Sequence, residues 1–329
     1  MRIAVLGVGS IGGLILGALS TTDHDLLAVS RGETALRLAA EGLVLHHHDG
    51  PIEMIPPSRF QVVDTDLSYR YSIGADGRSV QQTVSSIDMA IICGKSGDTK
   101  SLGHIARYLL SGTGSDPTRV LSVQNGLGNI EKLSDMLGES KVLGGSTTHG
   151  AWRDDSGGVH WAGFGSITVG SLERKSPGQI EASLIQAFED ANLNPSWSKD
   201  LNSSIWMKAI INVAINPICA IAGLENGMIE SDPHLLSLSL AAASEAATVA
   251  RSKGIDIPDI DIESRVIEVI RSTSNNRCSM LQDLMSGRRT EIDSLCGRIS
   301  EEAEAYGVPV PVNSALYALV KAIETSNTV

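Results

Sequence analysis

The feature that most constrains the fold of this chain is a glycine motif within its first twelve residues. A short apolar segment, residues 2–6, runs into Gly-Val-Gly-Ser-Ile-Gly at residues 7–12, and an apolar-periodic stretch follows up to residue 19. A second apolar segment occupies residues 25–29. Strand, glycine turn, helix and strand in this order predict the first βαβ unit of a dinucleotide-binding sheet.

Each glycine of the motif has its own expected role. Gly7 permits a tight turn, Gly9 lets the backbone approach a pyrophosphate, and Gly12 lets the helix pack closely against the strand. The N–H groups and the positive dipole at the start of the helix would attract that pyrophosphate. The alternative is that the glycines only form a strand-to-helix turn. The cofactor-binding residues predicted here are Gly7, Val8, Gly9, Ser10, Ile11 and Gly12.

The end of the second predicted strand bears on which dinucleotide is bound. An NAD site usually has Asp or Glu at this point for the ribose 2′-hydroxyl, whereas an Arg accommodates a 2′-phosphate. This chain has Ser30 and Arg31, and its next acidic residue is Glu33. A guanidinium can bind a phosphate through two hydrogen bonds, and a neighbouring hydroxyl can add one more. We therefore expect NADPH, with NADH possible if Arg31 is only a solvated surface residue.

The alternation of elements predicts two domains, for which 329 residues suffice. Strands alternate with helices up to residue 199, which predicts an α/β domain with a doubly wound, mostly parallel sheet. The stretch after residue 55 is polar and irregular, with hairpin signals within residues 69–86. From residue 200 to 329 we expect an all-α domain, in which Pro217 is interpreted as a linker signal. Its predicted helices are residues 203–215, 234–253, 262–271, 294–306 and 313–325.

Charge and cysteine content narrow the classes of function. The formal net charge is −12 and no long basic run occurs, which argues against nucleic acid or an anionic membrane as a partner. The four cysteines show no C-x-x-C spacing, so a disulfide framework or zinc site is not expected and a reducing cytoplasm fits. The run His46-His47-His48 is interpreted as a solvated loop, and no metal is predicted.

The sequence predicts neither a signal peptide nor a membrane-spanning helix. The chain starts directly with a strand and lacks the basic and apolar regions of a signal peptide. Two apolar stretches, residues 209–224 and 235–250, are interrupted by polar residues and are predicted to be buried helices. The apolar helical domain could support a homodimer.

One predicted helix of the second domain carries polar residues among apolar ones. Lys208, Asn212 and Asn216 are spaced i, i+4 and i+8, so they share one face. The surrounding residues are apolar, which is typical of a buried helix. Burial lowers the pKa of an ammonium, as a general acid near neutral pH requires. The alternative is an ordinary lysine whose stem packs while its charge stays in water.

Two further groups of residues are candidates for the site. Ser279 and Asp283 lie one helical turn apart, and Glu291 follows after a glycine break. Such hydroxyl and carboxylate groups can bind a small polar substrate, although Asp283 could equally be an ion-pair partner. Lys95 and Asn125 follow predicted strands, and ligands of parallel sheets bind beyond the carboxyl ends of the strands.

Over essentially its whole length the chain resembles the ketopantoate reductases (2-dehydropantoate 2-reductases). The glycine motif, Arg31, Lys95 and Gln124-Asn125-Gly126 match, but the glycine motif is shared with many dinucleotide-binding enzymes. The specific matches are Trp206-x-Lys208-x-x-x-Asn212-x-x-x-Asn216-Pro217 and Ser279-Met-x-Gln-Asp283 with Gly287-Arg-x-Thr-Glu291-Ile-Asp293. The stretch of residues 46–86 departs from the family by being longer and more polar, which bears on the cofactor preference more than on the chemistry.

The resemblance implies a Rossmann-type N-terminal domain and a C-terminal domain like that of 6-phosphogluconate dehydrogenase. It implies NADPH-dependent reduction of ketopantoate to pantoate, in pantothenate and coenzyme A biosynthesis. Lys208 would be the general acid and Glu291 its partner. Lys95 would lie near the cofactor. Substrate or nicotinamide contacts would come from Asn125, Asn212, Asn216, Ser279 and Asp283.

Two other functions remain open at this stage. A related two-domain dehydrogenase could act on another small 2-keto or 3-hydroxy acid, which a panel of keto acids would reveal. A non-catalytic dinucleotide-sensing protein would bind NADPH without turning over a keto acid, but it would not need a proton donor such as Lys208.

Overall fold

The structure is a computed structural model of the chain. It describes residues 1–48, 50–67, 71–83, 87–110, 119–173, 175–257 and 261–326. The chain divides into two compact units, residues 1–124 with 129–201 and residues 125–128 with 202–329. The sequence predicts residues 125–128 to lie in the first domain, whereas in the structure they group with the second unit.

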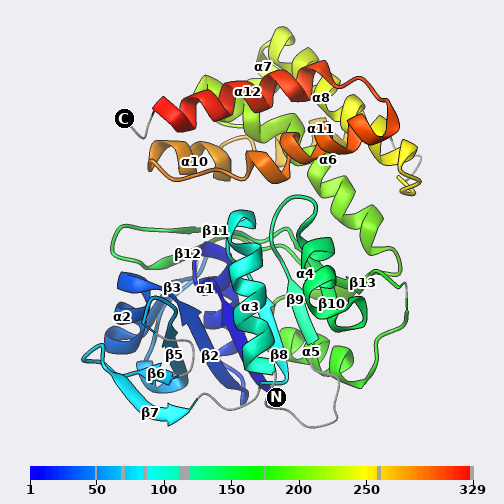
Figure 1. Cartoon of the computed structure of the whole chain (residues 1–329). Helices are drawn as coiled ribbons and strands as arrows, with labels where there is room; N and C mark the ends of the chain where they lie inside the picture. Colours follow the sequence, from blue (N-terminus) through cyan, green and yellow to red (C-terminus); the bar gives the residue numbers. More distant parts are fainter. Residues whose placement is uncertain are drawn as a thin grey trace. The chain divides into compact units, whose positions relative to one another are not determined.

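The first unit is built on an eight-stranded sheet (Figure 1). Every neighbouring pair is parallel except β10 with β13, which are antiparallel. The expected α/β fold with a mostly parallel sheet is therefore confirmed. In sheet order the strands are β14 (Pro195–Trp197), β13 (Ile167–Ser171), β10 (Val142–Thr147), β9 (Arg119–Ser122), β8 (Met89–Ile92), β1 (Arg2–Leu6), β2 (Asp25–Ser30) and β5 (Phe60–Asp64).

The edge strand β5 was not predicted, because Gln61 and the polar residues around it masked its apolar pattern. Phe60, Val62 and Val63 are nevertheless buried, and β5 pairs in parallel with β2. The polar Gln61 is accommodated because its side-chain oxygen accepts a hydrogen bond from Arg2 at 2.7 Å. A strand thus forms within the stretch that the sequence analysis described as irregular.

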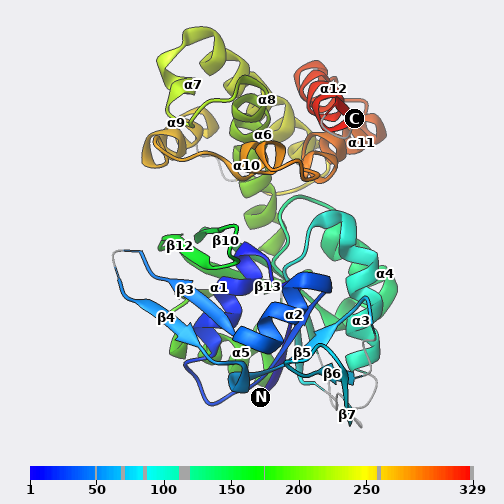
Figure 2. The ribbon, with the colours of Figure 1, turned by 90° about the vertical axis from the view of Figure 1, so that its left-hand side faces the viewer.

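Two smaller sheets complete the strands of this unit. A four-stranded sheet has the order β11 (Gly150–Arg153), β12 (Val159–Gly163), β3 (Leu43–His46) and β4 (Ile52–Ile55). Figure 2 shows β12, β3 and β4 of this sheet. The hairpin signals correspond to β6 (Tyr71–Ile73) and β7 (Ser79–Thr83), which pair antiparallel, while residues 69–70 and 84–86 lie outside the described residues. The helices of the unit are α1 (Ser10–Leu19), α2 (Gly32–Glu41), α3 (Thr99–Leu110), α4 (Asn129–Leu137) and α5 (Gln179–Asp190).

Helix α1 lies between the large sheet and the four-stranded sheet. It contacts β1 and β2 as well as β3, β11 and β12. A Cβ atom added at Gly13 or Gly17 would touch Val159 or Leu45 of the small sheet, at 2.6 and 3.0 Å. Because both sides are covered, all residues from Gly12 to Leu19 are buried. This explains why the helix is apolar around its whole circumference.

The described residues of the second unit form helices joined by turns and loops, with no strand among them, as expected. A core of apolar side chains holds it together, including Trp206, Ile210 and Val213 and an alanine-rich face. Small alanine side chains allow neighbouring helices to approach closely. The helices are α6 (Leu201–Ala222), α7 (Met228–Ser231), α8 (Pro233–Ser252), α9 (Ile262–Ser272), α10 (Ser279–Met285), α11 (Cys296–Tyr306) and α12 (Pro311–Ser326), with a 3₁₀ turn η4 (Ile292–Ser294) before α11.

The interpretation of Pro217 as a linker signal is wrong, because α6 continues through it to Ala222. An internal proline costs a helix about 3 kcal/mol. Ile218 and Cys219 beyond it are buried in the core, and such burial can offset a cost of that size. By length and composition alone α6 could cross a membrane, but 56% of its apolar window is buried inside the structure. It therefore has the character of a core helix.

Candidate active site

The glycine turn between β1 and α1 has the backbone geometry that the motif predicts. Gly7 has φ +90°, and a Cβ there would lie 2.6 Å from the nitrogen of Gly94. A Cβ at Gly12 would lie 2.1 Å from the carbonyl oxygen of Gly7. At Gly9, by contrast, a Cβ would meet nothing within 4 Å. Two glycines are therefore required by the fold itself, and Gly9 leaves open space over the turn.

The N-terminus of α1 is available to an anion. Its N-cap is Gly9, and no side chain caps the helix. The first N–H groups of a helix have no acceptor within the helix, so together with the dipole they favour a negatively charged ligand.

The loop after β2 is held by a buried carboxylate. Ser30 is the last residue of β2 and pairs with Asp64 of β5. Oδ1 of Asp64 accepts hydrogen bonds from the backbone N–H of Gly32 at 2.9 Å and of Asp66 at 3.0 Å. Gly32 has φ +53°, and Arg31 before it is exposed. Asp64 therefore shapes the turn that presents Arg31, a role that the sequence analysis missed because β5 was not recognised.

A second arginine lies beside the glycine turn and was not predicted. Arg153, the last residue of β11, donates hydrogen bonds to the carbonyl oxygen of Val8 at 3.3 Å and to Oγ1 of Thr34 at 3.1 Å. Val8 belongs to the glycine motif, and Thr34 lies in the first turn of α2. Contacts across 145 and 119 residues leave no local signal in a sequence.

The loops after β8 and β9 are joined by Gln124. Its side-chain amide donates to the carbonyl oxygens of Gly94 at 2.9 Å and Lys95 at 3.1 Å, and to Oγ1 of Thr99 at 3.0 Å. Lys95 is half-buried. The backbone around Lys95 is thereby fixed next to Gly94, which packs against Gly7.

Asn125 and the glycine after it are anchored within the second unit. Gly126 has φ +82°, and a Cβ there would lie 2.2 Å from the hydroxyl oxygen of Ser294. The N–H of Leu127 donates to the carbonyl oxygen of Ser294 at 2.8 Å. Only glycine fits at position 126, so this close packing fixes the place of Asn125.

The central contact of the site joins Lys208 and Asn125. The ammonium of Lys208 donates a hydrogen bond to Oδ1 of Asn125 at 2.6 Å. Burial lowers the pKa of Lys208 to about 8, although the negative charge of Glu291 opposes part of this shift. The residue Lys208 as a whole is only partly buried. The loss of solvent that lowers the pKa is the loss around its ammonium group. A proton donor that titrates close to neutral pH is suited to general acid catalysis.

Asn212 and Asn216 continue the polar face of α6 that starts at Lys208. All three are half-buried, while Ala209, Val213 and their apolar neighbours on the other side are buried. The Cys278 thiol donates to the backbone oxygen of Asn216 at 3.5 Å. This contact brings the start of α10, and with it the exposed Ser279, to the end of the polar face.

The structure gives Asp283 an ion-pair partner. Its side chain is buried, and Oδ1 lies 3.2 Å from Nε of Arg288. Of the two interpretations, the ion pair is the one observed. A substrate contact at Asp283 remains a prediction without support from these contacts.

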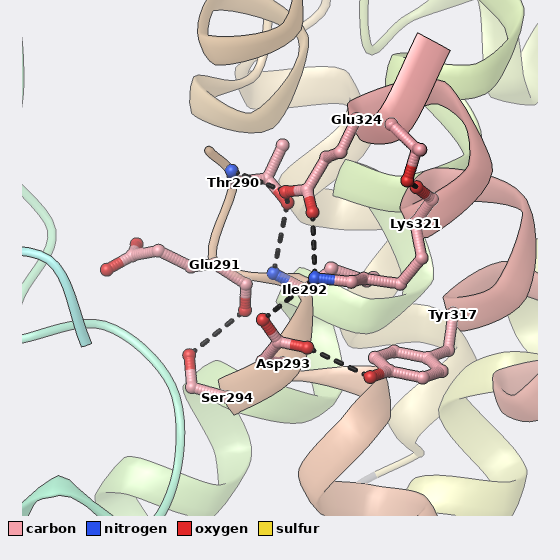
Figure 3. A network of polar contacts seen from close by, with 9 residues as sticks. Thr290, Glu291, Ile292, Asp293, Ser294, Tyr317, Lys321 and Glu324 are labelled. Atoms are coloured by element: carbon pink, nitrogen blue, oxygen red, sulfur yellow. Dashed lines mark hydrogen bonds and ion pairs between the residues drawn. The ribbon is translucent and has the colours of Figure 1, made fainter. Parts of the chain in front are cut away.

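Glu291 projects from a segment that α12 holds firmly (Figure 3). Glu324 accepts hydrogen bonds from the backbone N–H and the hydroxyl of Thr290 at 2.6 and 2.7 Å. Asp293 accepts from the hydroxyl of Tyr317 at 3.0 Å and lies 3.2 Å from the ammonium of Lys321. The Glu291 carboxylate points away from this network in Figure 3. Its negative charge acts on the ammonium of Lys208 and raises the pKa of that group.

Family models and known proteins match the chain in both of its units. Residues 3–174 match the family model described as ketopantoate reductase PanE/ApbA, and residues 200–324 match the model of its C-terminal domain. The chain is 33% identical to the 2-dehydropantoate 2-reductase of Halobacterium salinarum and 30% identical to that of Archaeoglobus fulgidus, with 98% of each chain covered.

Solved structures resemble the chain over its full length. A PanE/ApbA family ketopantoate reductase from Ralstonia eutropha superimposes with a TM-score of 0.84 at 26% identity, covering 100% of both chains. A D-mandelate dehydrogenase solved with NADH and anilino(oxo)acetate gives 0.83 at 23% identity, again over 100% of both chains, and shows a shared fold.

Proposed function

The chain belongs to the ketopantoate reductase family, and on this premise we propose that it reduces 2-dehydropantoate to pantoate with NADPH. The observation that carries the proposal is the half-buried lysine of α6. Its ammonium is bound to Asn125 at 2.6 Å and has a pKa of about 8. A reductase needs such a donor, because the ketone oxygen must gain a proton as the carbon gains a hydride.

The residues of the first unit fit a dinucleotide. The uncapped start of α1 offers N–H groups and a positive dipole to a pyrophosphate, and the open space over Gly9 gives room for it. When bound and reduced, the cofactor supplies the hydride. The chain contributes orientation: Gln124 fixes the loop of Lys95, and Asp64 shapes the turn of Arg31.

The second unit supplies the proton and the substrate contacts. Lys208 donates its proton to the substrate ketone oxygen, and Asn125 holds the ammonium in place until then. Glu291 keeps the ammonium protonated by its negative charge. Hydrogen bonds to the substrate carboxylate can come from the amides of Asn212 and Asn216 and the hydroxyl of Ser279. Because the protein has a net charge of −12, an anionic substrate needs such donors close to it.

The preference for NADPH over NADH rests on two arginines. Arg31 is exposed directly after β2, where a 2′-phosphate would lie, and Arg153 brings a second guanidinium to the turn of Val8 and the start of α2. An NAD site uses a carboxylate near this point to bind the ribose 2′-hydroxyl. Oδ1 of Asp64 already accepts two backbone hydrogen bonds, so this oxygen is engaged within the protein rather than presented to a ribose.

The test is oxidation of NADPH by the pure protein with 2-dehydropantoate, repeated with NADH. We expect turnover with 2-dehydropantoate and a higher kcat/KM for NADPH. Because a D-mandelate dehydrogenase shares the fold, the keto acid related to mandelate belongs in the substrate panel. Faster turnover of that or another keto acid would replace the substrate assignment. Binding of NADPH without turnover of any keto acid would favour a sensor.

A further inference from the structure

A row of aromatic and imidazole side chains crosses one face of the four-stranded sheet. Trp152 of β11 is the register partner of His160 of β12, and His160 is the partner of His46 of β3. Register partners point to the same face of a sheet. The ring centroids of Trp152 and His160 lie 3.9 Å apart, and those of His160 and His46 lie 4.0 Å apart, with nearly parallel planes in both cases.

A carboxylate completes a cluster with the two histidines. Oδ2 of Asp154 lies 2.8 Å from Nε2 of His160. One ligand atom from each of His46, Asp154 and His160 can be chosen so that all three lie within 4.8 Å of one another. The side chains of Asp154 and His160 are each 25% exposed, so an ion can reach them from solvent.

The turn between β11 and β12 orients this carboxylate. Oδ1 of Asp154 accepts hydrogen bonds from the hydroxyl of Ser156 at 2.7 Å and from the N–H of Gly158 at 2.8 Å. These bonds fix the carboxylate through one oxygen and direct the other toward the histidines. The site is thus built into the turn rather than formed by mobile surface side chains.

A glycine keeps the space between the ligand atoms open. A Cβ at position 158 would lie 2.7 Å from Oδ2 of Asp154 and 3.1 Å from Nε2 of His46. The φ angle of Gly158 is outside the range that disfavours other residues, so the backbone conformation does not require glycine here. A requirement for glycine at this position would therefore come from the space beside Asp154 and His46.

We propose that His46, Asp154 and His160 bind a divalent transition-metal ion, with Zn²⁺ as the expected ion. Two imidazoles and one carboxylate are a ligand set that Zn²⁺ accepts, with water completing a tetrahedron. Such ligands lie about 2.0–2.2 Å from the ion, so ligand atoms within 4.8 Å of one another are close to the spacing that a shared ion requires. The run of residues 46–48 alone predicts no metal site, because Asp154 and His160 lie more than a hundred residues further along the chain.

Binding requires one movement in the cluster. The stacked imidazoles lie in planes only 5° apart, so an ion cannot lie in both ring planes at once. One ring must turn about its Cβ–Cγ bond, and the ion must replace the contact between His160 and Asp154. Because Trp152 stacks on His160, its fluorescence should change when the ion binds.

The experiment is a Zn²⁺ titration of the full chain, prepared without a polyhistidine tag, followed by calorimetry and tryptophan fluorescence. We expect one ion per chain. Loss of a ligand in His46→Gln, His160→Gln or Asp154→Asn should weaken binding by more than about 100-fold, since even an outer-shell change costs 10–100-fold. Trp152→Phe should remove the fluorescence response and retain the bound ion.

Two variants make the test specific. Gly158→Ala should abolish binding by filling the space beside Asp154 and His46, with an unchanged circular dichroism spectrum. His47→Gln should retain full affinity, because His47 instead contacts Glu53 at 3.0 Å. Absence of saturable binding, or binding lost with His47→Gln and kept in His160→Gln, would overturn the proposal. Turnover of 2-dehydropantoate is not the readout, so this result is independent of the proposed function.

Discussion

Helices α1 and α6 are both strongly apolar, but they serve the proposed reaction in different ways. α1 is buried from Gly12 to Leu19 and carries no ionisable side chain, so the N–H groups and the dipole at its N-terminus are what it offers to a negative charge. α6 is buried on one side and presents Lys208, Asn212 and Asn216 on the other. The comparison teaches that a main-chain anion site needs a helix start without a side-chain cap, whereas a proton donor needs a polar stripe on an otherwise buried helix.

The largest effect is expected from removing the donor of α6. Lys208→Ala should lower kcat/KM for 2-dehydropantoate by about 10²–10⁴-fold, or about 3–5 kcal/mol, because general acid catalysis contributes that much. NADPH affinity, measured by fluorescence titration, should change little. Lys132→Ala, on the exposed surface of α4, is the matched control. If Lys208→Ala keeps more than about a tenth of the wild-type kcat, Lys208 is not the general acid.

The next largest effect is expected from removing Arg31, the residue proposed to select NADPH. Arg31→Ala should raise the KM for NADPH by about 10–100-fold, as expected for lost hydrogen bonds between charged groups. The KM for NADH should stay nearly constant, since NADH lacks the 2′-phosphate. Equal losses with both cofactors would show that Arg31 supports the fold rather than the selection of NADPH.

Two glycines of the α1 turn separate a structural from a binding role. Gly12→Ala should lower the free energy of unfolding by about 1–3 kcal/mol, because its Cβ would overlap the carbonyl oxygen of Gly7. Gly9→Ala meets no neighbour, so its thermal stability should match the wild type while its NADPH affinity falls. Thermal melts with and without NADPH measure both. Equal destabilisation by the two substitutions would contradict the assignment.

The smallest effect is a displacement of the pH profile. The ammonium of Lys208 is protonated below its pKa of about 8, so reduction should slow as the pH rises through this value. Oxidation of pantoate needs the free amine and should accelerate over the same range. Glu291→Gln removes the charge that raises this pKa, and the fall in kcat/KM should therefore move to lower pH. An unmoved profile would mean that another group limits the rate.

Local patterns predicted most of the fold and the backbone part of the site. The glycine turn and the polar stripe of α6 can be read directly, because their residues are neighbours in one turn or on one helix face. β5 escaped notice since Gln61 broke its pattern, and Pro217 was misjudged because only the packed core shows that residues beyond it are buried. Arg153 and the cluster of His46, Asp154 and His160 join segments more than a hundred residues apart, which no local pattern reveals.

The grouping of residues 125–128 with the helical unit has a practical consequence. A fragment starting at residue 202 would contain Lys208 and Glu291. It would lack Asn125, whose amide oxygen accepts the hydrogen bond of the Lys208 ammonium at 2.6 Å, and Gly126, which packs on Ser294. Dissecting the enzyme at this point would leave a gap in the fragment's own interior. An exchange of the helical unit between relatives should therefore transfer this four-residue stretch along with the helices.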